Sequence, residues 1–183
     1  MRGVLFRVLC MALWALSVMP LAWAADALIP LSTRPDVTTS YWWMPRDGSS
    51  ATVLLFSGGS GGIGYREGGP KSGNFLIRSR NEFAKAGFNV ALMGNPSDMP
   101  KLTPAFRQSP EHFADVRAVV QDIRARSQVP IWLVGTSQGT ISAAAAGIDL
   151  GPSIQGVVLT ATLSGQQFGG SVSDLALAKL AVP

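Results

Sequence analysis

The sequence predicts an α/β fold, a mostly parallel sheet flanked by helices, formed by residues 25–183 as one domain. Two observations carry this prediction. Short apolar runs of strand length alternate with segments of helical periodicity, which is the order of elements that builds parallel sheets. The apolar run Ile131–Val134 also leads through Gly-x-Ser-x-Gly directly into an Ala-rich helical stretch. A strand, a tight turn and a helix are therefore expected at this point of the chain.

The first 24 residues are predicted to be a secretory signal peptide. Arg2 and Arg7 precede an apolar run from Val8 to Trp23, and Ala22-Trp23-Ala24 supplies a small-x-small cleavage site. The run contains Pro20 and is short for a membrane-spanning helix, so an uncleaved anchor is the less favoured alternative. Once the signal is cleaved, no stable membrane insertion is expected. We therefore expect an exported protein, periplasmic or secreted, that begins at Ala25.

The net charge argues against a nucleic-acid-binding protein, and the position of the single Cys argues against disulfides. Loss of the two signal arginines lowers the net charge from +4 to +2, and no basic stripe remains, so nucleic acid is not an expected partner. The single Cys also lies in the signal segment, so the mature chain has no disulfides and relies on a buried core.

The predicted strands follow in chain order. Residues 26–34 are taken as a loose leader. Val37–Met44 is rich in β-branched and aromatic residues, which is typical of a strand. Val53–Phe56 is apolar on both faces and indicates a buried strand. Further strands are expected at Asn89–Met93 and Val157–Thr160.

Two helices and an irregular segment lie between these strands. Phe75–Gly87 has apolar residues at helical spacing, and Gly87 can end the helix. The segment Asn95–Pro110 contains four prolines and predicts an irregular excursion at the carboxyl end of a strand, where α/β folds place their ligands. Ser109 is a predicted helix cap, with Pro110 at the first helical position.

The Gly-x-Ser-x-Gly turn is the strongest chemical signal in the chain. Ser137 stands at its apex, where the backbone is strained and where side chains at Gly135 or Gly139 would collide across the turn. The hydroxyl of Ser137 would then lie at a helix N-terminus, where developing negative charge is favoured. This arrangement predicts a nucleophile.

A glycine-rich loop follows the strand at Val53–Phe56 and admits two interpretations. Residues 59–64 fit Gly-x-Gly-x-x-Gly, but a dinucleotide site needs a helix that begins there, and Gly68-Gly69-Pro70 excludes one. Pro70 also lacks the N–H that a phosphate loop needs before Lys71. The favoured alternative is that the loop supplies backbone N–H donors to an oxyanion, because glycines let the backbone approach a substrate closely.

Together these motifs resemble the α/β-hydrolase family. The resemblance covers nearly all of residues 25–183 and rests on the strand and Gly-Gly loop, residues 73–80, Asn95-Pro-Ser-Asp98 and Gly-Thr-Ser137-Gln-Gly. It implies a serine hydrolase that acts on an ester or a related small acyl substrate, without cofactor or metal. Ser137 would be the nucleophile, and the N–H of Gln138 one oxyanion donor. Gly58, Gly59 or Ser60 would supply the other.

The sequence departs from the family at the catalytic acid and base. The family places both after the nucleophile, whereas His112, the only His, precedes it. A polar residue in a first helical turn is expected to be solvated or to bond the backbone, with a role as base for His112 as the alternative. Asp174 is interpreted as a helix cap, and Asp98 either lines the pocket or is an ordinary turn residue.

We therefore expect a hydrolase that lacks its C-terminal strands, with the triad acid and His beyond residue 183. The competing hypothesis is a non-catalytic ligand-binding protein on the same fold, with its pocket kept and its triad lost. The identity of the substrate, its acyl length and the oligomeric state are not specified by the sequence.

Overall fold

A computed structural model describes residues 25–163, 172 and 175–183. Six strands form one sheet in the order β1-β2-β6-β3-β7-β8. The pairs β1–β2 and β2–β6 are antiparallel, and the pairs β6–β3, β3–β7 and β7–β8 are parallel. The α/β prediction is therefore confirmed. The six strands are β1 (Ala27–Arg34), β2 (Val37–Met44), β3 (Ala51–Phe56), β6 (Phe88–Pro96), β7 (Ile131–Thr136) and β8 (Gly156–Thr160).

The prediction of a loose leader before residue 35 was wrong. Ala27–Arg34 is strand β1, which pairs with β2 from Ala27 opposite Trp43 to Arg34 opposite Val37. Pro30 obscured the strand in the sequence. Within the described residues β1 is an edge strand, and a proline is tolerated there because the missing N–H need not bond a neighbour.

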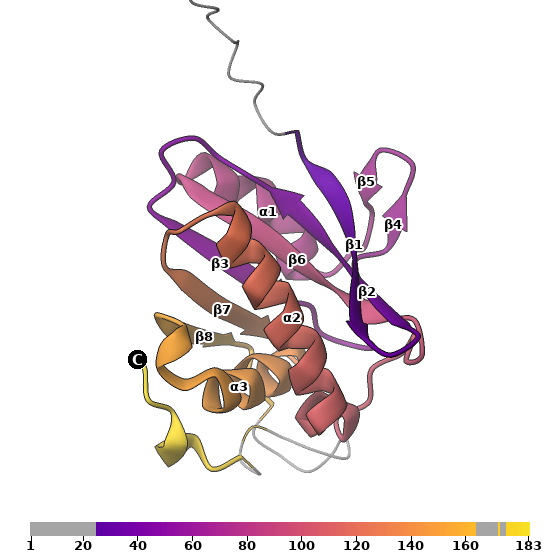
Figure 1. The fold of residues 1–183 in the computed structure, drawn as a ribbon, viewed down its shortest axis with the longest axis vertical. Helices are drawn as coiled ribbons and strands as arrows, with labels where there is room; N and C mark the ends of the chain where they lie inside the picture. Colours follow the sequence, from indigo (N-terminus) through magenta and orange to yellow (C-terminus); the bar gives the residue numbers. More distant parts are fainter. Residues whose placement is uncertain (1–24, 164–171, 173–174) are drawn as a thin grey trace, which may run out of the picture.

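Three helices cover the two faces of the sheet. Figure 1 shows α2 (Pro110–Arg126) and α3 (Gly139–Leu150) in front of the sheet and α1 (Phe75–Lys85) behind it. The helix expected at residues 75–87 is thus confirmed. So is the cap, because the Ser109 hydroxyl accepts a hydrogen bond from the backbone N–H of His112.

Strand β3 supplies side chains to the core on both sides of the sheet. Leu54 and Phe56 pack toward α2 and α3, whereas Val53 and Leu55 pack toward α1. All four are buried, as the continuous apolar run predicts for a central parallel strand. This burial fixes the carboxyl end of β3, from which the glycine-rich loop leaves.

The last described residues lie beside the outer edge of β8. The carbonyl of Pro183 accepts a hydrogen bond from the N–H of Val157 at 2.8 Å, and Val182 packs against the core. No helix in the described part of the chain is long and apolar enough to cross a membrane. The predicted signal peptide, residues 1–24, lies outside the described residues.

Candidate active site

Ser137 occupies the sharp turn between β7 and α3. Its φ is +52°, a left-handed conformation that residues other than glycine seldom adopt. Its backbone N–H donates to the carbonyl of Thr160 at 3.1 Å, and its carbonyl accepts from the N–H of Thr140 at 3.0 Å. The strained turn is thus held from both sides. The strand-turn-helix geometry predicted for residues 131–146 is confirmed, which places the Ser137 side chain at the apex.

Two glycines make this turn sterically possible. A Cβ on Gly135 would lie 2.6 Å from the carbonyl oxygen of Gly139. A Cβ on Gly139 would lie 2.1 Å from the carbonyl oxygen of Phe56, at the end of β3. Both distances are far below any real carbon–oxygen contact, so α3 approaches the sheet this closely only because these positions have no side chain.

The glycine-rich loop lies directly against the turn at Ser137. A Cβ on Gly58 would lie 2.9 Å from the Cβ of Ser137 and 3.0 Å from the carbonyl oxygen of Thr136. The loop then closes a tight turn, in which the N–H of Gly61 donates to the carbonyl of Gly58 at 3.2 Å. Gly59, inside that turn, has a φ of +60°. The structure therefore brings the predicted loop and the predicted nucleophile together.

The backbone N–H groups proposed as oxyanion donors form no hydrogen bonds with the described residues. This holds for Gln138, which precedes the first residue of α3, and for Gly59 in the loop. An N–H at a helix N-terminus carries partial positive charge from the helix dipole. The Gln138 N–H is thus both unoccupied within the described chain and electrostatically suited to an anion.

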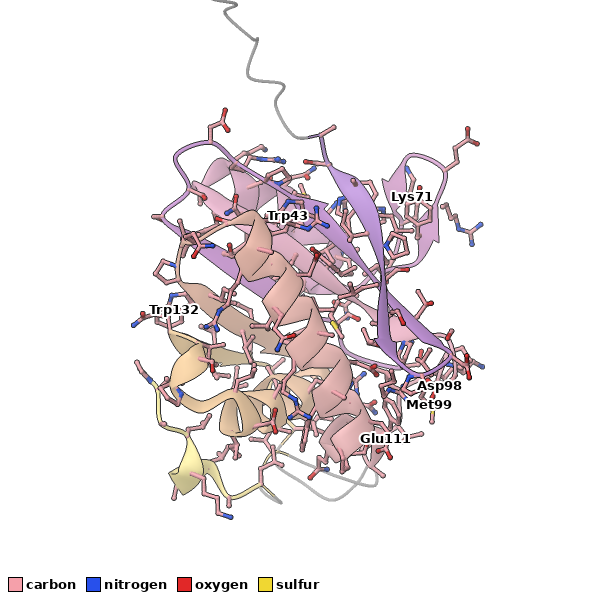
Figure 2. The ribbon with its side chains drawn as sticks, viewed as in Figure 1. Trp43, Lys71, Asp98, Met99, Glu111 and Trp132 are labelled. Atoms are coloured by element: carbon pink, nitrogen blue, oxygen red, sulfur yellow. The ribbon has the colours of Figure 1, made fainter. Side chains whose placement is uncertain are left out.

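The Pro-rich segment predicted at Asn95–Pro110 crosses the glycine-rich loop. Its irregular part is residues 97–109, because Asn95 and Pro96 end β6 and Pro110 begins α2. The N–H of Leu102 and the side-chain amide of Asn95 both donate to the carbonyl of Ser60, each at 2.9 Å. The excursion therefore lies at the same edge of the sheet as Ser137, as predicted. Figure 2 shows its Asp98 and Met99 at the same end of the molecule as Glu111 in the first turn of α2.

Arg107 is a buried residue of this site that the sequence did not reveal. It is only 1% exposed, and it donates to the carbonyl of Gly59 at 2.9 Å and to the hydroxyl of Ser142 on α3 at 2.8 Å. Burial lowers the pKa of Arg107 to about 10. Neither its place among four prolines nor Ser142's place in an Ala-rich run signalled this contact.

His112 is neither solvated nor bonded through its ring to the backbone, so that prediction was wrong. Its ring is fully buried, and Nε2 forms a 3.0 Å hydrogen bond with the hydroxyl of Ser142. Burial first, and then the charges of Arg107 and Arg34, lower the pKa of His112 to about 3. The ring is thus neutral at pH 7 and is bonded to Ser142, not to Ser137.

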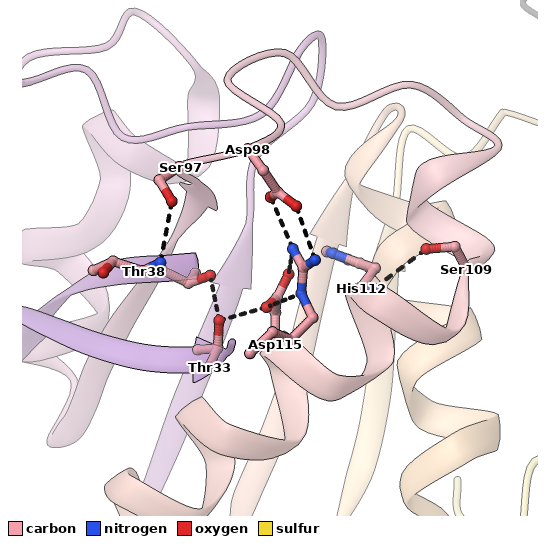
Figure 3. A network of polar contacts seen from close by, with 9 residues as sticks. Thr33, Thr38, Ser97, Asp98, Ser109, His112 and Asp115 are labelled. Atoms are coloured by element: carbon pink, nitrogen blue, oxygen red, sulfur yellow. Dashed lines mark hydrogen bonds and ion pairs between the residues drawn. The ribbon is translucent and has the colours of Figure 1, made fainter. Parts of the chain in front are cut away.

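Asp98 belongs to an ion-pair network. Its carboxylate accepts two 2.8 Å hydrogen bonds from Arg34, which also pairs with Asp115 at 2.9 Å (Figure 3). The Arg34 guanidinium lowers the pKa of Asp98. Asp98 is therefore an exposed anchor for the start of the excursion. Asp174, predicted as a helix cap, lies outside the described residues.

The structure argues against a nucleotide site at residues 59–64. The glycines continue into a short hairpin, β4 (Tyr65–Arg66) paired with β5 (Gly69–Pro70), and the next helix begins only at Phe75. A pyrophosphate site requires a helix that begins directly at the glycine-rich turn, and the chain after this loop does not form one. In the described residues, no three His, Cys, Asp or Glu side chains form a cluster able to hold a metal ion.

The fold is similar to that of solved α/β serine hydrolases. An α/β serine hydrolase without a lid, from Xanthomonas campestris, superposes with a TM-score of 0.55 at 19% identity, over 74% of this chain and 61% of its own. An esterase from Pyrococcus furiosus superposes with a TM-score of 0.51 at 23% identity, over 73% of this chain and 50% of the esterase.

A serine hydrolase homologue from Coxiella burnetii gives a TM-score of 0.55 at 17% identity, over 87% of this chain and 71% of its own. At these identities the likeness concerns the fold alone. This chain spans less than two thirds of the first two structures' length. No protein-family model and no curated protein matches the sequence.

Proposed function

We propose that this protein is a serine hydrolase that acts on a small ester or related acyl substrate. The observation that carries the proposal is the contact between the strained turn at Ser137 and the glycine-rich loop at Gly58. It places the N–H of Gln138 and the N–H of Gly59 on two segments that meet at the same serine. Acyl transfer needs this combination, because a nucleophile must stand beside donors for the developing oxyanion.

The chemistry follows from these groups. The Oγ of Ser137 attacks the carbonyl carbon of the substrate while its proton passes to a base, and the carbonyl oxygen becomes an oxyanion held by the N–H groups of Gln138 and of the loop. Collapse expels the alcohol, which takes up the proton. Water then hydrolyses the acyl-enzyme and restores the Ser137 hydroxyl.

Among the described residues, no His side chain forms a hydrogen bond with Ser137. His112 is the only His of the sequence and bonds Ser142. We propose that the base and the acid of a triad belong to sequence that follows residue 183 in a longer form of the protein. The share of the neighbours' length that this chain covers supports this proposal.

A short-chain aryl ester tests the proposal. The 183-residue chain should show only the residual catalysis of an oxyanion hole, about 10³- to 10⁴-fold over water. A form extended by its natural downstream sequence should turn over far faster. Ser137→Ala should reduce the extended form to this residual level, whereas Ser97→Ala, at an exposed position of the same edge, should leave its turnover unchanged. Turnover of the extended form that is undiminished by Ser137→Ala would reject the proposal.

A non-catalytic binding protein on the same fold is the second candidate. Two observations favour it: the neutral, occupied His112, and an apolar hollow of about 690 Å³ on the α1 side of β7 and β8. An extended form that folds, binds an acyl compound and never turns it over would support this candidate.

The cellular location remains a proposal from the sequence. We propose export, with Ala25 as the mature N-terminus, because residues 1–24 have the basic start, apolar run and small-x-small site of a signal peptide. The N-terminal sequence of protein expressed in a bacterium measures this directly. Soluble cytoplasmic protein that begins at Met1 would contradict it.

A further inference from the structure

In the part of the chain that the structure describes, the buried charge of Arg107 has no partner charge. No carboxylate of the described residues lies within ion-pair distance of its guanidinium, although the side chain is almost fully buried. Its Nε also forms no hydrogen bond there. Burying an unpaired cation is costly, and elsewhere in this structure the arginine Arg34, also largely buried, has two carboxylate partners. Structural packing alone therefore does not explain Arg107.

The two hydrogen bonds of Arg107 join the two halves of the candidate oxyanion hole. Nη2 donates to the carbonyl of Gly59 in the loop, and Nη1 donates to the hydroxyl of Ser142 on the helix that begins just after Ser137. A guanidinium is planar and rigid, so it fixes the distance between its two acceptors. Arg107 thus sets how the loop sits over the N-terminus of α3.

The bond to Gly59 also restricts a peptide that glycine would otherwise leave free to rotate. Gly59 is flanked by two peptide units. The carbonyl of the preceding unit, on Gly58, accepts from the N–H of Gly61, and the carbonyl of the following unit, on Gly59 itself, accepts from Arg107. Since C=O and N–H point in opposite directions across a trans peptide, holding both carbonyls fixes the orientation of the N–H groups of Gly59 and Ser60.

We propose that Arg107 is a positioning residue of the oxyanion loop: it holds the peptide between Gly59 and Ser60 in the orientation that presents the Ser60 N–H to the substrate beside that of Gly59, and it adds positive charge near the forming oxyanion. This inference rests on the proposed hydrolase function. Two observations support the proposal: the carbonyl of Gly59 is bonded to the buried Arg107, and Gly59 and Ser60 are themselves exposed. The lowered pKa of Arg107 agrees with a cation held in a dry site.

Two readouts on the 183-residue chain test the proposal. The first is the rate at which a fluorophosphonate modifies Ser137, because this reagent places an oxygen in the oxyanion hole. The second is NMR relaxation dispersion at the amides of residues 58–61, which needs no activity. The variant is Arg107→Met, and the matched control is Gln108→Met, in the same turn, whose side-chain amide bonds the carbonyl of Pro104.

Arg107→Met should slow modification of Ser137 about tenfold or more, and it should produce microsecond-to-millisecond exchange at the Gly59 and Ser60 amides. Gln108→Met should match the wild type in both measurements. Should Arg107→Met not fold, Arg107→Lys replaces it. Lysine keeps the charge but loses the planar fork, so it should give a smaller slowing and retain the exchange.

The outcomes separate the two proposals. If wild-type Ser137 is modified neither in the 183-residue chain nor in the extended form, the hydrolase function fails, and the exchange measurement still decides whether Arg107 orders the loop. If Ser137 is modified equally fast in the wild type and the folded Arg107 variant, and the loop amides are unchanged, the positioning role is overturned. A loop that becomes mobile without any change in rate also rejects it, because the loop's order would then not serve the reaction.

Discussion

Gly58 and Ser137 are 79 positions apart in the sequence, yet a single added Cβ on Gly58 would lie 2.9 Å from the Cβ of Ser137. The contact exists because β3 and β7 are parallel neighbours, so their carboxyl ends meet at one edge of the sheet. β3 leads into the glycine-rich loop and β7 into the turn at Ser137. The close approach of these two segments therefore requires that Gly58 has no side chain.

Gly58→Ala should separate the loop from Ser137. The new Cβ forces the backbone apart, so we expect modification of Ser137 by a fluorophosphonate to slow at least about tenfold, with a stability loss of about 1–3 kcal/mol. Gly73→Ala is the matched control, because a Cβ there meets nothing within 4 Å and the φ of Gly73 is not positive. Equal rates in the two variants, measured on folded protein, would show that this contact is unimportant.

The backbone conformation of Gly59, and not a lack of space, should determine which substitutions it tolerates. A Cβ there also meets nothing within 4 Å, but its φ is +60°, which a β-branched residue resists. Gly59→Val should therefore reorient the loop donor and cost up to about 10² to 10³ in rate. Gly59→Asn should cost much less, because Asn adopts this conformation more readily. Ester turnover of the two variants in the extended form measures this difference. If Gly59→Val left turnover unchanged, the loop would have no part in the mechanism.

The sequence predicted the fold and the two segments of the candidate site, the turn at Ser137 and the glycine-rich loop, because these depend on local pattern. Glycine spacing, apolar runs and the Ser109 cap can each be recognised in a short stretch of the sequence. Three features could not be predicted, because they depend on tertiary contacts. Strand β1 depends on pairing with β2 despite Pro30, His112 is buried by tertiary packing, and Arg107 meets Gly59 only because the excursion folds back over the loop.

His112 should make the protein less stable at mildly acidic pH. Its folded pKa of about 3 lies below its ordinary value of 6.5 because of burial and then of Arg107 and Arg34. The unfolded chain takes up a proton that the folded chain excludes, so stability is complete above pH 6.5 and is lost progressively as the pH falls toward 3.

His112→Gln should remove that dependence. Urea unfolding at pH 7.5 and pH 5 measures it in a range where the lowered pKa values of Asp98 and Asp122 contribute little. The wild type should lose more stability between these two conditions than the variant. Parallel losses would mean that the ring is not buried as a neutral group.

Asp115 and Asp98, which both pair with Arg34, should contribute differently to the stability of the protein. Asp115 is fully buried and also accepts from the hydroxyl of Thr33, whereas the Asp98 side chain is 44% exposed. Asp115→Asn leaves a cationic Arg34 facing a neutral buried amide and should cost about 3 kcal/mol or more. Asp98→Asn breaks an exposed pair and should cost about 1 kcal/mol or less. Chemical denaturation of both variants checks the order, and a larger loss for Asp98→Asn would contradict it.

The most direct test of the central claim is the mass of the peptide that contains Ser137, after prolonged exposure of the 183-residue chain to a fluorophosphonate. We predict one phosphonyl adduct, located on Ser137, formed slowly because no triad base lies beside it, and absent from Ser137→Ala. An adduct spread over several exposed serines, or none on Ser137 in either this chain or the extended form after the reagent has had time to react, would contradict the assignment of this serine as the nucleophile.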